Sequence, residues 1–169
     1  MIMIKMGTYS IRPMKREDLS AVAELEKVCF SEPWSLALLS DSLHRKEYLF
    51  LVAEAEEESG IKRIAGYLGA RIVLDEMEIA NVAVFPEYRK RGIGEAMMTE
   101  LLSLATEQEL YGVTLEVRIS NETAIRLYEK LGFVREGIRP GFYSKPVEDA
   151  LILWYYPKKD QEPKQDQNS

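Results

Sequence analysis

Residues 81–94 read Asn81-Val82-Ala83-Val84-Phe85-Pro86-Glu87-Tyr88-Arg89-Lys90-Arg91-Gly92-Ile93-Gly94. An apolar run typical of a buried strand ends at a proline, a short basic turn follows, and two glycines then open a long helical pattern. The first turn of a helix leaves backbone N–H groups unpaired and carries the positive end of the helix dipole. Glycines at this point let an anion approach the backbone with no Cβ in the way. The stretch therefore predicts a phosphate-binding loop between a strand and a helix.

Two widespread phosphate loops fit this stretch less well. A dinucleotide-binding loop needs Gly-x-Gly-x-x-Gly directly after its strand, whereas here Met97 stands at the third glycine and seven residues separate Val84 from Gly92. A Walker loop needs Gly-Lys-Ser/Thr, which is absent. An ordinary helix start beside a solvated basic turn is the remaining alternative. A lone Gly-x-Gly would favour that alternative, but the combination of strand, proline, basic turn and glycines favours a phosphate loop.

Outward from the loop, the hydrophobic pattern predicts alternating strands and helices. The expected order is β-α-α-β-β-β-α-β-α-β-β, with hairpins first and a βαβ crossover after them. The sheet is therefore mixed and the fold class is α/β, or α+β mixed. The expected elements are a strand at 8–14, helices at 16–29 and 35–44, strands at 48–55, 63–74 and 77–85, a helix at 92–109, a strand at 113–119, a helix between Asn121 and Gly132, and late strands at 133–135 and 150–156.

Composition limits the classes of protein that fit. The 169 residues predict one domain over 8–156, followed by a disordered tail over 157–169 that has no apolar residue except prolines. The net charge of −6 argues against a general nucleic-acid binder, and no apolar run is long enough to span a bilayer. One cysteine and one histidine exclude a disulfide framework and a histidine-rich metal site, so we expect no metal. A cytoplasmic protein without direct contact to nucleic acid or membrane is the simplest interpretation.

Motifs spread over the chain point to one family. Arg89-x-x-Gly92-x-Gly94 after Val82-Ala83-Val84 resembles the acetyl-CoA loop of the GCN5-related N-acetyltransferases, and the element order from about residue 8 to 156 matches that fold. Within the superfamily, the stretches at 115–121 and 124–133 resemble the RimI type, the bacterial ribosomal-protein-alanine N-acetyltransferases. Further stretches at 29–35, at Arg139 with Tyr143, and at 148–150 resemble it too.

The resemblance implies a fold, a co-substrate and a set of residues that bind it. The fold would have a central, mostly antiparallel mixed sheet of six to seven strands with about four helices around it. Acetyl-CoA would be the co-substrate, its pantetheine arm pairing like an extra strand with backbone groups of Val82 and Val84. The residues implied in binding it are Val82, Ala83, Val84, Arg89, Lys90, Arg91, Gly92, Ile93, Gly94, Glu95 and Asn121. On pattern alone, the valines are ordinary sheet core and Asn121 is a helix cap.

Two residues carry the expected chemistry. Glu116 lies on the polar face of an alternating strand, where a solvated surface pair with Arg118 is the alternative interpretation. The resemblance makes Glu116 the base that accepts a proton from the attacking amine, which is protonated near neutral pH. Tyr128 lies on an apolar helical face, where a core tyrosine is the alternative. The resemblance makes it the acid that protonates the departing CoA thiolate.

The acceptor side is less specific in sequence. Phe30, Trp34 and Tyr143 are candidates to line an acceptor groove, although aromatic residues at such positions also serve as core. RimI-type enzymes often have two adjacent tyrosines after the late arginine, whereas this chain has Phe142-Tyr143. The expected function is acetyl transfer to a protein N-terminus, on the RimI resemblance the N-terminal alanine of a small-subunit ribosomal protein. The alternatives are transfer to a small amine, an antibiotic or a lysine, and a binding module for acyl-CoA without catalysis.

Overall fold

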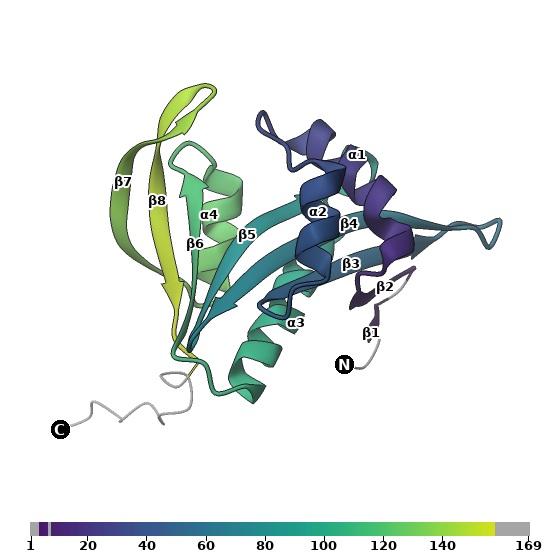
Figure 1. Cartoon of the computed structure of the whole chain (residues 1–169), viewed down its shortest axis with the longest axis horizontal. Helices are drawn as coiled ribbons and strands as arrows, with labels where there is room; N and C mark the ends of the chain where they lie inside the picture. Colours follow the sequence, from purple (N-terminus) through teal and green to yellow (C-terminus); the bar gives the residue numbers. More distant parts are fainter. Residues whose placement is uncertain (1–3, 7, 158–169) are drawn as a thin grey trace.

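The strands form a single mixed sheet in the computed structural model, which describes residues 4–6 and 8–157. The strand order is β1-β2-β3-β4-β5-β6-β8-β7, and every neighbouring pair is antiparallel except β5 and β6, which are parallel. Figure 1 shows β1 to β5 on one side of that parallel junction and β6 to β8 on the other. The strands are β1 (Ile4–Met6), β2 (Tyr9–Pro13), β3 (Tyr48–Glu56), β4 (Lys62–Val73), β5 (Glu76–Val84), β6 (Gly112–Arg118), β7 (Val134–Ser144) and β8 (Val147–Tyr155).

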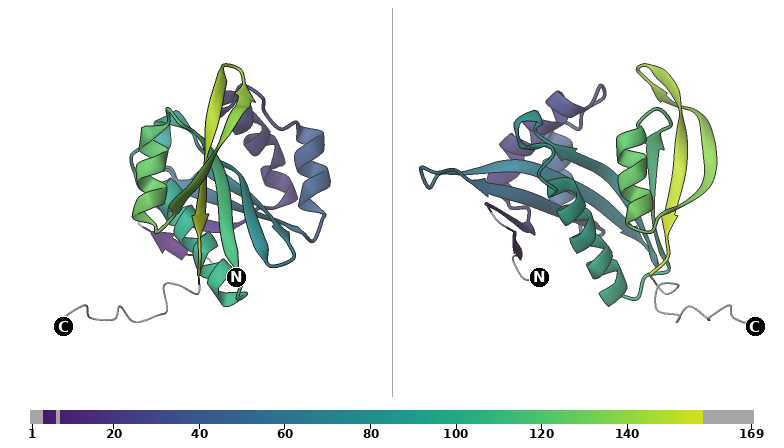
Figure 2. Two further views of the ribbon diagram at one scale, coloured as in Figure 1. Left: turned by 90° about the vertical axis from the view of Figure 1, so that its left-hand side faces the viewer. Right: turned by 180° about the vertical axis from the view of Figure 1, so that it is seen from behind.

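Two helices cover each face of the sheet. Figure 2 shows α1 (Leu19–Cys29) and α2 (Leu36–Leu43) on one face, and α3 (Ile93–Glu107) and α4 (Glu122–Lys130) on the other. Side chains fix two helix starts: Ser35 Oγ accepts the N–H of Leu38 at 3.1 Å, and Asn121 accepts the N–H of Ala124 at 3.2 Å. None of the helices in the described part of the chain is long and apolar enough to cross a membrane.

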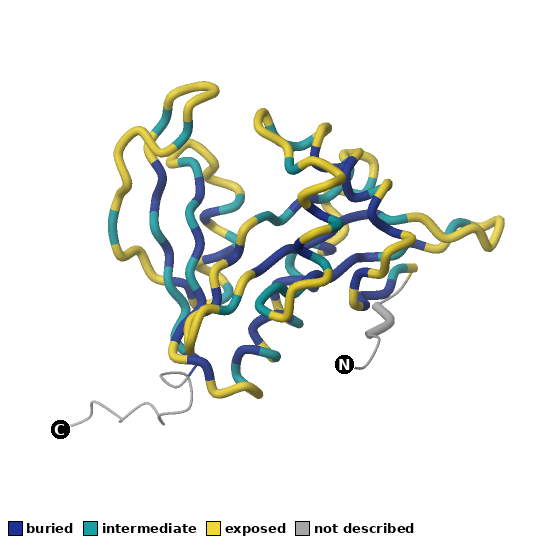
Figure 3. The backbone as a smooth tube through the Cα atoms, in the orientation of Figure 1, coloured by how far each residue is buried: buried dark blue, intermediate teal, exposed yellow. Residues whose placement is uncertain are grey.

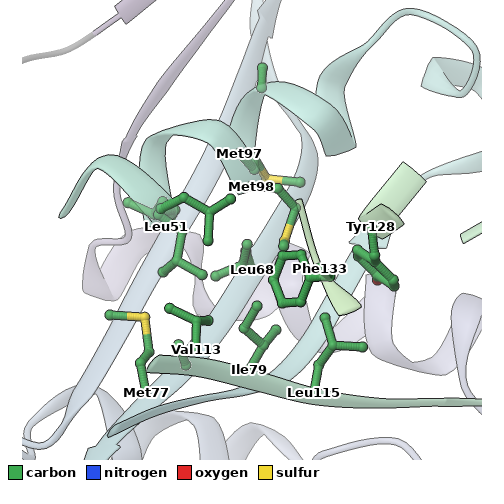
Figure 4. Close-up of a cluster of buried hydrophobic side chains, with 14 of the residues drawn as sticks. Leu51, Leu68, Met77, Ile79, Met97, Met98, Val113, Leu115, Tyr128 and Phe133 are labelled. Carbon is green, nitrogen blue, oxygen red and sulfur yellow. The ribbon is translucent and has the colours of Figure 1, made fainter. Parts of the chain in front are cut away.

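Each face of the sheet has its own hydrophobic core. The larger core lies under α3 and α4, where Met97 and Met98 of α3 belong to one cluster of buried side chains with Val113 and Leu115 of β6 (Figure 4). The smaller core lies under α1 and α2 around Leu25, Leu39 and Tyr67. Figure 3 shows burial concentrated along the central strands, while β7 at the sheet edge is mostly exposed.

The fold class and the order of elements expected from the sequence are confirmed. Three details differ. An additional short strand, β1, pairs with β2 and brings the described sheet to eight strands instead of six or seven. The late strands are longer than expected, because none of the eleven residues of β7 is buried and its apolar residues do not alternate with polar ones. The expected disordered tail lies, beyond residue 157, outside the described residues.

A β-bulge changes the direction of β5 before its last four residues. Gly69 pairs with Asn81 and Ala70 pairs with Ile79, so Ala80 is an extra residue on the β5 side. A bulge bends its strand and reverses the alternation of side chains beyond it. As a result, Ile79 and Val82 both contact the core under α3, whereas Asn81 and Ala83 face α1. The bulge therefore turns the end of β5 away from the line of the sheet.

Candidate active site

The parallel strands β5 and β6 separate shortly after they meet. Their ladder joins only residues 76–78 of β5 to residues 112–114 of β6, and Figure 1 shows the two strands diverging from there. On the edge of β5 that faces away from β4, the residues from Ile79 to Val84 have no strand beside them in the described part of the chain. Such an edge presents unpaired N–H and C=O groups that an extended chain can bind. We name the opening between the two strands the splay.

The ladder on the other edge of β5 decides which backbone groups face the splay. The N–H of Phe85 donates to Ala65 O on the β4 side at 2.8 Å. Backbone groups of alternate residues in an antiparallel ladder point to the same neighbour. Ala83 therefore bonds toward β4, while the backbone groups of Val82 and Val84 point into the splay.

The loop after β5 ends at an uncapped helix. A short 3-10 turn over residues 86–88 leads to Gly92, whose φ of +76° is the left-handed conformation that glycine adopts without strain. No side chain caps α3, so its first N–H groups point out of the helix end. A Cβ built on Gly94 meets no protein atom within 4 Å, which leaves open space beside those groups. An anion fits this position.

The charged residues of the loop are partly engaged with the protein itself. Arg89 Nε donates to Val84 O at 3.0 Å, and its Nη2 lies 3.5 Å from Cys29 Sγ. Arg91 Nη2 donates to the backbone O of Glu87 at 3.2 Å. These contacts brace the loop against β5, a function that the count of basic residues does not reveal.

The structure also describes three other residues of the predicted cofactor set. Lys90 has a φ of +62°, a left-handed conformation in a residue other than glycine. Ile93 is buried, so only its backbone can face a ligand. Glu95 pairs with Lys130 of α4 at 2.9 Å, which ties the two helices together beside the loop.

Glu116 lies at the start of the splay, two residues beyond the last paired residue of β6. Its side chain is 14% exposed, and its Oε1 lies 3.4 Å from Nη2 of Arg139 on β7. Burial raises the pKa of Glu116, the charge of Arg139 opposes this rise, and Glu78 on β5 adds to it. A carboxylate with a raised pKa that still contacts solvent is suited to accept a proton near neutral pH.

Tyr128 is buried on the opposite face of the sheet. The centroids of its ring and the ring of Phe133 are 5.8 Å apart, and Figure 4 shows the two rings in the same core. No group in the described part of the chain hydrogen-bonds its hydroxyl, and the same part contains no fully buried polar side-chain atom without a partner. The hydroxyl must therefore contact solvent at the surface of the core. Burial, with a smaller contribution from Tyr143, raises the pKa of Tyr128 to about 12.

Tyr143 connects these two residues electrostatically. Its pKa is raised, first by burial and further by the charge of Glu116, while Arg118 opposes the rise. Tyr143 therefore interacts electrostatically with Glu116 on one face of the sheet and with Tyr128 on the other. The ring of Tyr143 also lies under the guanidinium of Arg118, 4.2 Å from its centroid.

The predicted acceptor residues lie on two separate segments, which we call the two walls of the candidate acceptor site. Phe30 and Trp34 belong to the segment between α1 and α2 and pack against the smaller core, with Trp34 edge-on to Tyr48 at 6.2 Å. Tyr143 belongs to the β7–β8 hairpin on the other wall. Ser144 Oγ donates to Glu32 Oε1 at 3.1 Å and joins the walls. The structure brings these segments together, although the two α1–α2 aromatics also serve as core.

The sequence also matches a known protein family. The family model of the acetyltransferase (GNAT) family matches residues 19–133, which is more than half of the chain. The chain belongs to the acetyltransferase (GNAT) family. The confirmed order of elements and the splay between β5 and β6 agree with this assignment.

Individual relatives cover nearly the whole chain. The ribosomal protein bS18-alanine N-acetyltransferase of Salmonella typhimurium is 33% identical over 150 residues, which are 88% of this chain and 96% of the relative. The crystal structure of the ribosomal-protein-S18-alanine N-acetyltransferase from Escherichia coli superposes with a TM-score of 0.77 at 28% identity, covering 95% and 99% of the two chains. Ard1 from Thermoplasma volcanium gives the same TM-score at 30% identity and covers 88% and 97%. The expected resemblance to RimI-type acetyltransferases is confirmed.

Several residues of this GNAT site were not singled out from sequence. Arg118 donates to the backbone O of Lys145 and of Pro146, at 3.0 Å each, and contacts Glu148 at 3.3 Å, so it holds the β7–β8 hairpin. Glu26 and Asn81 form a buried hydrogen bond across α1 and β5. The sequence signal for Glu26 is a charged residue on the apolar face that Val22 and Leu25 define.

Proposed function

We propose that the protein transfers the acetyl group of acetyl-CoA to the N-terminal amine of a protein, with the N-terminal alanine of ribosomal protein bS18 as acceptor. The observation that carries the transfer is the half-buried carboxylate of Glu116 at the start of a splay whose other side is an open strand edge. The acceptor follows from the names of the Salmonella and Escherichia coli relatives. The cytoplasmic location stays a prediction of the sequence.

The residues present fit acetyl-CoA. The backbone groups of Val82 and Val84 suit the amide groups of a pantetheine arm, because both partners are extended and both donate and accept. The space beside Gly94 suits a pyrophosphate at the uncapped start of α3. The Val84 carbonyl already accepts from Arg89, so this side chain must release it or share it when the arm binds. Bound acetyl-CoA supplies the thioester carbon that the amine attacks.

Glu116 acts as the base. The amine nitrogen forms a bond to the thioester carbon, and the proton that this nitrogen loses passes to the Glu116 carboxylate directly or through water. The Arg139 guanidinium beside Glu116 favours the ionised form of the carboxylate, which is the form that accepts a proton. The C–S bond then breaks and the electron pair leaves with sulfur as thiolate.

Tyr128 acts on the leaving group. With its pKa raised to about 12, the phenol stays protonated throughout the working pH range. Complete transfer to a thiolate, whose thiol has a pKa of about 8.5, is unfavourable. The hydroxyl therefore stabilises the developing thiolate first by hydrogen bonding, and solvent restores any proton that it gives up.

The Tyr128→Phe variant separates this role from packing. The change keeps the ring that contacts Phe133 and removes only the hydroxyl. We expect kcat with a peptide acceptor to fall at least about tenfold, equivalent to about 1.4 kcal/mol in the barrier, while the melting temperature barely changes. Tyr111→Phe is the matched control, since Tyr111 is exposed and lies outside the site. A Tyr128→Phe enzyme with wild-type kcat at saturation would exclude the acid role, provided that product release does not limit the rate.

Release of free coenzyme A thiol with a set of acceptors tests the proposed function. The set contains a peptide with the bS18 N-terminus, the same peptide blocked at its N-terminus and carrying an internal lysine, an aminoglycoside and spermidine. We expect turnover with the free N-terminal alanine and none with the blocked peptide. Preferred turnover of a lysine, an antibiotic or a polyamine would replace the acceptor, and tight coenzyme A binding without transfer to any of them would favour a binding module.

A further inference from the structure

The first helix carries a buried carboxylate that the proposed chemistry does not use. Glu26 lies in α1 on the side that faces the sheet and is 0% exposed. Its Oε1 accepts hydrogen bonds from Asn81 Nδ2 at 2.6 Å and from the hydroxyl of Tyr67. Its Oε2 accepts the backbone N–H of Trp34 at 2.9 Å. All three partners are donors, which is the set that an ionised carboxylate satisfies.

Burying this carboxylate without a cationic partner costs free energy. No lysine, arginine or histidine forms an ion pair with Glu26 in the part of the chain that the structure describes. Burial raises the pKa of Glu26, and its three hydrogen bonds only partly oppose that rise. An apolar side chain of similar size at such a position is often neutral or favourable for stability. Packing of α1 on the sheet alone therefore does not require a carboxylate here, and what Glu26 adds is its three hydrogen bonds.

The two carboxylate oxygens of Glu26 bind two different segments of the chain. Oε1 binds Asn81, the first residue beyond the bulge and the start of the β5 segment 81–84 that faces the splay. Oε2 binds the backbone of the segment 30–35, which carries the predicted acceptor residues Phe30 and Trp34. A single buried side chain therefore connects the edge that suits the co-substrate with the wall that suits the acceptor.

We propose that Glu26 is a positioning residue that ties the acceptor segment 30–35 to the co-substrate segment 81–84, so that a ligand bound at one segment orders the other segment. The assignment of the two sides rests on the proposed function. The tie itself rests on the three hydrogen bonds of Glu26 and on the place of Asn81 at the bulge. The thermodynamic consequence is positive coupling between coenzyme A and acceptor, which is reciprocal.

A pair of variants of equal length tests the tie. Glu26→Met fills the same space but accepts no hydrogen bond from Trp34 or Asn81. Glu26→Gln keeps the length: its carbonyl can accept from the N–H of Trp34 while its amide donates to Tyr67 and to a rotated Asn81 amide. Asp18→Asn serves as control, because Asp18 is another buried carboxylate next to the start of α1. Its partners Arg12 and Lys15 lie outside the segments 30–35 and 81–84.

Amide hydrogen exchange of Trp34 with and without coenzyme A gives a readout that needs no acceptor. We expect coenzyme A to slow this exchange about tenfold in the wild type, in Glu26→Gln and in Asp18→Asn, but less than about twofold in Glu26→Met. The KM of the bS18 peptide should rise about tenfold in Glu26→Met with little change in kcat. If Glu26→Met does not fold, Asn81→Ala cuts the tie from the β5 side and should give the same loss.

The outcomes separate the tie from the proposed function. A Trp34 amide that does not respond to coenzyme A in the wild type, or that responds equally in Glu26→Met and Asn81→Ala, would overturn the tie. An equal rise in KM in Asp18→Asn would reduce Glu26 to a stabilising residue. A wild-type enzyme that leaves the peptide unacetylated, but whose Trp34 amide responds as expected, would overturn the proposed acceptor and support the tie.

Discussion

Glu116→Gln should slow acetyl transfer to the alanine peptide about 10²–10⁴-fold near neutral pH, the range that general base catalysis typically supplies. Glutamine keeps the shape of the side chain and its place beside Arg139, but it cannot accept the proton of the amine. Coenzyme A affinity should stay nearly unchanged, because Glu116 lies on β6 and none of the residues expected to bind the co-substrate belongs to that strand. Steady-state kinetics combined with calorimetric titration of coenzyme A measure both quantities.

The pH dependence of this loss follows from the environment of Glu116. Burial raises the pKa of Glu116, so wild-type activity should fall as the pH drops through that raised value and the carboxylate gains a proton. The rate of the Glu116→Gln variant should show no such fall, because glutamine does not gain a proton in this pH range. Its rate should instead keep rising with pH toward the pKa of the acceptor α-amine, about 7.7–8.0, as the amine loses its proton without help. Glu116→Gln therefore recovers part of its activity at high pH.

A second carboxylate provides the matched control. Glu78 is exposed on β5, pairs with Thr114 in the ladder, and interacts with Glu116 electrostatically. Glu78→Gln removes one negative charge near the site but leaves the base, so we expect a small shift of the acid limb and a nearly unchanged maximal rate. A Glu116→Gln enzyme with wild-type rates at every pH would exclude Glu116 from proton transfer.

Local patterns were enough to predict most elements of the fold. The strand before the loop, the long helix after it and the alternating strand around Glu116 carry periodic apolar residues, and each lies within a few residues of its expected bounds. The strand β7 carries no such pattern. It is an edge strand with no buried residue, and its pairing with β8 is the main tertiary constraint on it. Sequence periodicity cannot show a strand of this kind.

The site was predictable only where one stretch of chain forms it. Gly92 and Gly94 would bind an anion through their own backbone, so the sequence alone predicts this role for them. The contacts of Glu26 with Asn81 and of Arg118 with Pro146 join residues 55 and 28 positions apart. Such contacts depend on the bulge in β5 and on the turn of the β7–β8 hairpin, which a single sequence does not define. The direction of Arg89 toward Val84 is likewise a result of the folded loop.

Gly94→Val should reduce coenzyme A affinity at least about 100-fold, about 2.7 kcal/mol, while the protein stays folded. The Cβ at this position meets no protein atom within 4 Å and the backbone is not left-handed, so valine adds no strain. Valine also suits a helix at least as well as glycine does. The new side chain would occupy the space in which a pyrophosphate approaches the N–H groups of α3. Gly92→Val is a poorer test, because its φ of +76° strains any substitution.

Calorimetric titration of coenzyme A into Gly94→Val and into Thr99→Val decides the assignment of the loop. Thr99 is exposed on α3 and lies further along the helix, so this variant places the same valine away from the helix end and loses only the hydrogen bond of the Thr99 hydroxyl to Glu95 O. We expect wild-type affinity in Thr99→Val and similar melting temperatures for both variants. The loss in Gly94→Val must therefore come from the blocked approach to the helix start. A folded Gly94→Val protein that binds coenzyme A as the wild type does would show that the phosphates bind elsewhere.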